Sequence, residues 1–71
     1  MKVSLKSKTV KQFLAERNLS QNWLAYRVKT STGYMSQMMN GTRNPSPAMR
    51  EKIQKVLKID DFNSLFKITH I

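Results

Sequence analysis

Residues 19–41 read LSQNWLAYRVKTSTGYMSQMMNG, and this stretch carries the signals for two short helices joined by a tight turn. Ser20 and Ser31 are each followed by helix-forming residues and are therefore candidate N-caps. Gly41 suits the left-handed conformation in which many helices end. We therefore predict helices over residues 20–28 and 31–40.

Three further helices are predicted on either side of this pair. Val10 and Leu14 share one face of an amphipathic stretch that Asn18 ends. Downstream, Ser46-Pro47 combines an N-cap with proline at the first helical position, and Asp60 or Asp61 can cap a short last helix. The predicted ranges are 6–17, 47–57 and 61–66.

The tail at 67–71 alternates polar and apolar residues. This pattern is compatible with a strand, with a flap over the core or with a frayed end. We favour a flap or fraying.

The chain's size and composition favour one domain over residues 1–71. A chain of 71 residues can hold one core, which leaves no room for a second catalytic or ligand-binding domain. The absence of cysteine excludes disulfides and thiolate metal sites. Because no apolar run is long enough for a signal peptide or a membrane span, we expect an intracellular protein with no membrane partner.

The charge balance points to an anionic partner. Thirteen Lys and Arg residues against four acidic ones give a net charge of +9, with a pI near 10.4. Nucleic acid is the first candidate, because binding of Lys and Arg to phosphates releases counterions. The plain alternative is a charge that only keeps the protein in solution.

The predicted helix over 31–40 has two chemically different sides at about 100° per residue. One side is apolar and can pack: Tyr34, Met35, Met38 and Met39. The other side can hydrogen-bond to base edges or approach them closely: Thr32, Gly33, Ser36, Gln37 and Asn40. An ordinary solvated helix face is the alternative interpretation of the second set.

Three segments occur in an order and spacing typical of one family: LSQNWLA at 19–25, STGYMSQM at 31–38 and NGTRNPS at 40–46. They resemble the Cro and phage-repressor helix-turn-helix family, and the resemblance extends through Phe66. It implies an all-α five-helix bundle with the lambda-repressor-like DNA-binding fold, whose third helix enters the major groove.

The resemblance also implies a function. It points to a sequence-specific transcriptional regulator of a phage genetic switch, acting on double-stranded DNA in the cytoplasm of a bacterial host cell. Members of the family often bind as homodimers. The family's phosphate contacts fall on Gln21, Arg43 and Asn44, and Lys29 in the turn could add another.

Two positions depart from the family pattern. Many relatives carry glycine where this chain has Lys29, and an acidic residue where it has Met39. Lysine at position 29 lowers the stability of the fold if the turn requires a positive φ there.

A second function hypothesis concerns a protein partner. Trp23 and Tyr26 are expected to point outward from the helix over 20–28, and Tyr34 and Met39 could extend the same surface. Exposed aromatic residues are enriched at binding hot spots. The resemblance therefore also suggests an antirepressor that binds a phage repressor protein and blocks its operator binding. The alternative is that Trp23 folds over a neighbouring element.

The sequence does not suggest an enzyme. The single histidine, His70, lies in the tail, and neither glycine belongs to a phosphate-binding loop. Adjacent Asp60 and Asp61 are better explained as helix caps than as a metal site. We expect no cofactor, no metal and no small-molecule substrate.

Overall fold

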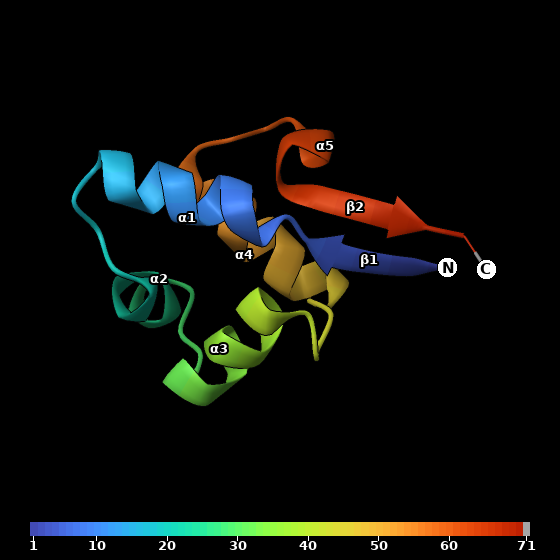
Figure 1. Ribbon diagram of the computed structural model, residues 1–71, viewed down its shortest axis with the longest axis horizontal. Coiled ribbons are helices and arrows are strands. Elements are labelled where there is room, and N and C mark those ends of the chain that lie inside the picture. Colours follow the sequence, from blue (N-terminus) through green and yellow to red (C-terminus); the bar gives the residue numbers. More distant parts are fainter. Residues whose placement is uncertain (71) are drawn as a thin grey trace.

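The computed structural model describes residues 1–70 and contains five helices and two short strands (Figure 1). Each helix lies within a residue or so of its predicted range. In chain order the elements are β1 (Lys2–Leu5), α1 (Ser7–Glu16), α2 (Gln21–Arg27), α3 (Thr32–Asn40), α4 (Pro47–Leu57), α5 (Phe62–Leu65) and β2 (Phe66–Thr69).

Serine hydroxyls cap the three central helices as predicted. Ser20 accepts the backbone N–H of Trp23 at 2.9 Å, and Ser31 accepts that of Tyr34 at 3.0 Å. Ser46 caps α4 in the same way at 3.2 Å. Because each cap satisfies a backbone donor that the helix itself leaves open, these serines fix where α2, α3 and α4 begin.

The prediction of an all-α fold is wrong in one respect, because the two ends of the chain form a sheet. β1 and β2 pair antiparallel, with Val3 opposite Ile68 and Leu5 opposite Phe66. Val3, Leu5 and Phe66 point into the core and are almost fully buried. Burial of these apolar side chains therefore holds β1 and β2 against the core. The tail at 67–69 is a strand rather than a flap or a frayed end, and Ile71 lies outside the described residues.

The core lies where the five helices and the sheet meet. Its most deeply buried large side chains come from nearly every element: Phe66, Leu24, Met35, Met38, Ile53, Leu65, Val10 and Val28. No charged or polar residue is buried among residues 1–70. The methionines of α3 are thus packing residues, as expected, and they fix which side of α3 faces outward. Within residues 1–70, no helix is both long and apolar enough to cross a bilayer.

Candidate nucleic-acid interface

Helix α3 presents its predicted polar face to solvent. Met35, Met38 and Met39 on its inner side are at most 4% exposed. On its outer side Ser36 is half-buried, and the remaining predicted residues are exposed: Thr32, Gly33, Gln37 and Asn40. No hydrogen bond ties these outer side chains to the described part of the chain, so their donors and acceptors are open to a ligand.

The turn between α2 and α3 is held by backbone hydrogen bonds. The N–H of Thr30 donates to the carbonyl of Ala25 at 2.9 Å, and the N–H of Lys29 donates to that of Tyr26 at 3.1 Å. Lys29 has φ 59°, so the positive φ that glycine would adopt freely is present in this turn. For a residue with a side chain this conformation costs about 1–2 kcal/mol. Lys29 therefore destabilises the turn locally.

The loop after α3 is anchored on one backbone carbonyl of α3. The oxygen of Gln37 accepts the N–H of Thr42 at 3.0 Å, the N–H of Arg43 at 3.3 Å and the hydroxyl of Thr42 at 3.2 Å. Gly41 makes this reversal possible with φ 80°. Arg43 is thereby attached to the same turn of helix that carries the exposed Gln37 side chain.

The guanidinium of Arg43 also lies over an aromatic ring. Its Cζ is 5.3 Å from the centroid of Tyr34, a half-buried residue that packs against the core. This cation–π contact restricts a long side chain without neutralising its charge. The sequence did not predict this role for Tyr34, because the spacing of nine residues gives no local signal of contact.

The remaining predicted phosphate contacts, Gln21, Asn44 and Lys29, lie in different parts of the structure. Gln21 is half-buried at the first position of α2, and Asn44 is exposed in the loop beyond Arg43. Lys29 lines a cleft together with Lys52 and Lys55 of α4. The structure thus brings Arg43 and Asn44 next to α3, whereas Lys29 faces α4.

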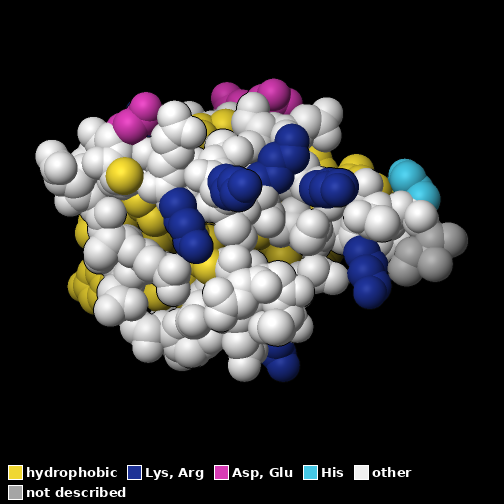
Figure 2. All heavy atoms as spheres, in the orientation of Figure 1, with side chains coloured by type: hydrophobic (Ala, Val, Ile, Leu, Met, Phe, Trp, Pro, Cys, Tyr) yellow, Lys and Arg dark blue, Asp and Glu magenta, His cyan; other side chains and the backbone are white. Residues whose placement is uncertain are grey.

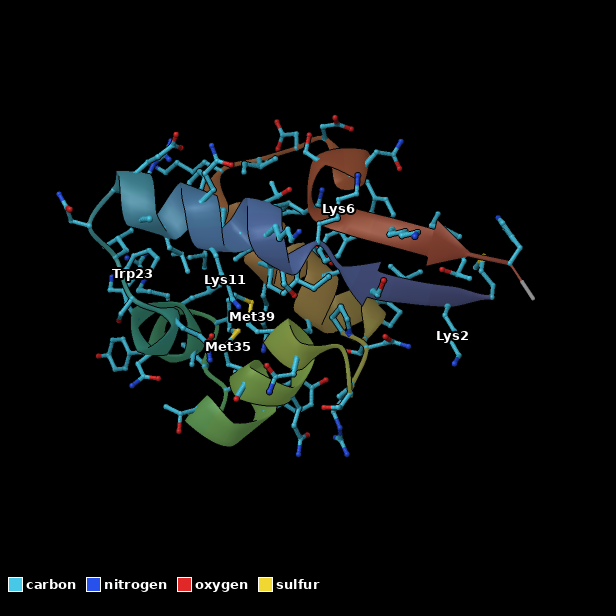
Figure 3. All side chains as sticks on the ribbon, viewed as in Figure 1. Lys2, Lys6, Lys11, Trp23, Met35 and Met39 are labelled. Carbon is cyan, nitrogen blue, oxygen red and sulfur yellow. The ribbon has the colours of Figure 1, made fainter. Side chains whose placement is uncertain are left out.

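The surface predicted for a protein partner does not form as one exposed face. Tyr26 is 79% exposed. Trp23 is half-buried and packs against the core, and Figure 3 places it where α1 ends and α2 begins. Tyr34 lies beneath Arg43. Met39 is only 4% exposed, and its carbonyl accepts the Ser7 hydroxyl at 2.6 Å. The extension of this surface to Met39 is therefore wrong, whereas its predicted place on the apolar side of α3 is confirmed, because it belongs to the buried core.

Positive charge also lies outside the polar face of α3. Figure 2 shows Lys and Arg side chains in a row over α1 and the sheet, with acidic side chains at the upper edge of the same view. By the strand register, Lys2 and Lys67 share the outer face of the sheet. Among residues 1–70 the one ion pair within 4 Å joins Lys55 to Glu51. Most of the positive charge is therefore available to an anionic partner.

The remaining candidate groups show ordinary roles. Asp61 caps α5 by accepting the N–H of Asn63 at 3.2 Å and the hydroxyl of Ser64 at 2.8 Å. His70 is exposed. Residues 1–70 contain no cluster of His, Cys, Asp and Glu that could hold a metal ion.

Comparison with known proteins gives one informative similarity. No family model matches the chain, and no curated protein is significantly similar to it. The fold is similar to the crystal structure of a protein from Bacteroides fragilis that is described as a candidate DNA-binding protein, with a TM-score of 0.71 and 25% sequence identity. The similarity covers 92% of this chain and 98% of that protein.

Proposed function

We propose that this protein binds double-stranded DNA sequence-specifically and regulates transcription by occupying an operator. The observation that carries the proposal is the two-sided character of α3. Methionines on its inner side are buried in the core, and its outer side carries only small or hydrogen-bonding residues. A helix of this kind fits the major groove, where each base pair presents a distinct pattern of donors and acceptors. The similarity to the protein from Bacteroides fragilis supports the same proposal.

The residues divide into base-reading and backbone-contacting sets. Gln37 and Asn40 can each form paired hydrogen bonds with adenine, and Thr32 and Ser36 can donate to or accept from several bases. We assign Arg43 and Asn44, next to the end of α3, to phosphate contacts, with Gln21 at the start of α2 as a further contact. Phosphate contacts set the register, and base contacts select the sequence.

The regulatory setting is a finer part of the proposal. The resemblance of residues 19–46 to Cro and phage repressors supports a role in a phage genetic switch, as a repressor that blocks transcription, and a homodimer on DNA. The antirepressor alternative rested on Trp23 and Tyr26 pointing outward, with Tyr34 and Met39 as an extension of the same surface. Burial of Met39 and partial burial of Trp23 and Tyr34 leave the DNA-binding proposal the better supported of the two.

The test is selection of randomised duplex DNA on the purified protein. We expect a recovered sequence that binds at least about 10³-fold more tightly than bulk duplex at physiological salt. Two half-sites about one helical turn apart would indicate a dimer on DNA. Weak binding that is flat across sequences and strongly dependent on salt would overturn sequence-specific recognition.

A further inference from the structure

Two neighbouring clefts lie along α2 and α4 and share Arg27 and Val56 in their walls. Their volumes are about 220 and 300 Å³. We refer to the pair as the α2–α4 groove. Trp23 lines the larger cleft, and no residue of the polar face of α3 lines either one. The groove is thus a surface separate from the candidate DNA interface.

The floor of the groove is apolar. Its larger cleft exposes parts of four hydrophobic side chains that pack against the core: Phe13, Leu19, Trp23 and Val56. The guanidinium of Arg17 lies 3.6 Å from the Phe13 ring centroid, and that of Arg27 lies 5.2 Å from the Trp23 ring. The rings therefore hold fixed positive charges at the border of an apolar floor.

The rim of the groove is strongly positive. Six cationic side chains line it: Arg17, Arg27, Lys29, Lys52, Lys55 and Lys58. No carboxylate lines either cleft, and Glu51, which contacts Lys55 at 3.4 Å, is the one acid within ion-pair distance of a lysine among residues 1–70. Most of this charge is uncompensated within the described chain.

Two of the groove's lysines occupy positions where lysine is a poor structural choice. Lys29 has φ 59° and Lys58 has φ 57°, which is the left-handed region that glycine adopts more easily. Each follows a helix, where a cation gains some energy from the helix dipole, but that gain at most offsets the strain. Lys29 lines the smaller cleft, and Lys58 lines the larger one. Fold stability therefore does not account for charge at both positions.

We propose that the α2–α4 groove binds an acidic amphipathic segment of a partner protein, in which carboxylates alternate with large apolar side chains. Carboxylates match the cationic rim, and apolar side chains match the floor around Trp23. A DNA backbone has phosphates but no large apolar side chain for that floor. A second copy of this chain has only four acidic residues against thirteen basic ones, so it is a poor source of carboxylates for that rim. The proposal does not depend on DNA binding.

The experiment is selection of a displayed random peptide library on the whole protein, followed by titration of the recovered peptides. Trp23 is the only tryptophan of the chain, so its fluorescence reports directly on the groove. We expect the recovered peptides to be rich in Asp and Glu alternating with Leu or aromatic residues, and to change Trp23 emission on binding. Peptides without carboxylates, or peptides that leave Trp23 emission unchanged, would overturn the proposal.

A double variant, Lys29→Gly with Lys58→Gly, separates recognition from folding. It removes two rim charges and relieves two positive-φ lysines, so its free energy of unfolding should be maintained or raised. Its affinity for the selected peptide should nevertheless fall by about tenfold. Unchanged affinity in this variant contradicts the proposal.

The matched control is Lys8→Gln with Lys11→Gln, which removes the same number of charges from α1 outside the groove. Its peptide affinity should stay within about twofold of the parent, because exposed charges at a distance are screened by salt. Duplex DNA serves as a competitor. If DNA alone changes Trp23 emission and displaces the peptide, the groove is a nucleic-acid contact and the proposal is wrong. Failure of operator selection would leave the peptide result intact, so the two proposals fail separately.

Discussion

Gln37 has two separable roles at the candidate interface. Its backbone carbonyl anchors the loop that carries Arg43, whereas its side chain is exposed. Gln37→Ala keeps the carbonyl and removes only the side chain. We expect a loss of about 1–3 kcal/mol of discrimination at one base position, measured with operators altered one base pair at a time. Gln12→Ala, on the exposed side of α1, is the matched control. Equal base preference in both variants would exclude Gln37 from sequence reading.

Arg43 is expected to act on the backbone of any duplex. Arg43→Ala should weaken binding to all sequences alike and reduce the slope of log affinity against log salt by about one unit. Arg50→Ala is a close control, because Arg50 also lies over a ring, that of Phe62 at 5.9 Å, but on α4. The measurement is a salt titration with operator and bulk DNA. A slope that both substitutions lower equally would reflect net charge rather than a contact.

Replacing Lys29 with glycine should stabilise the fold. Lys29→Gly relieves the positive φ and should raise the free energy of unfolding by about 1 kcal/mol, measured by urea denaturation. Thermal denaturation should shift upward by about 4–8 °C for a domain of this size. Lys52→Gly, within α4, should instead lose about 1 kcal/mol, because glycine weakens a helix interior. A loss of stability in Lys29→Gly would mean that its side chain makes contacts that outweigh the strain.

At the scale of elements, the helices and their caps were predictable because their signals are local. A serine cap and the first turn it satisfies lie within three residues of each other, as Ser31 and Tyr34 do. The polar face of α3 follows from the same short-range periodicity. The sheet was missed because each strand has four residues and pairs with a segment more than fifty residues away. The surroundings of Met39 and Trp23 likewise depend on packing between elements.

Two apolar residues of β2 should contribute unequally to fold stability, a difference that sequence periodicity alone does not indicate. Phe66 and Ile68 lie on the same face of β2, yet Phe66 is 1% exposed and Ile68 is 41% exposed. Phe66→Ala should therefore cost about 3–5 kcal/mol, which is enough to unfold much of a small domain, whereas Ile68→Ala should cost less than about 1.5 kcal/mol. Circular dichroism during urea denaturation measures both. Similar small losses would mean that β2 adds little to the core.

The whole molecule carries a charge of +9 on 71 residues, which favours anionic partners but also repels itself. Lys8, Lys11 and Lys67 are exposed and have no carboxylate within 4 Å among the described residues. Changing all three to glutamine should therefore raise the melting temperature at about 10 mM salt, where the screening length is about 30 Å. The difference should vanish near 1 M salt, where that length is about 3 Å.

Lys55→Gln is the control for this charge effect, because Lys55 contacts Glu51 at 3.4 Å and its removal relieves repulsion while losing an attraction. Its melting temperature at low salt should change little. The triple variant should also bind bulk DNA more weakly, so the same three lysines would lower fold stability and strengthen association with DNA. A stability gain of equal size at both salt concentrations would show that the lysines act through packing or helix propensity, since only an electrostatic effect is removed by screening.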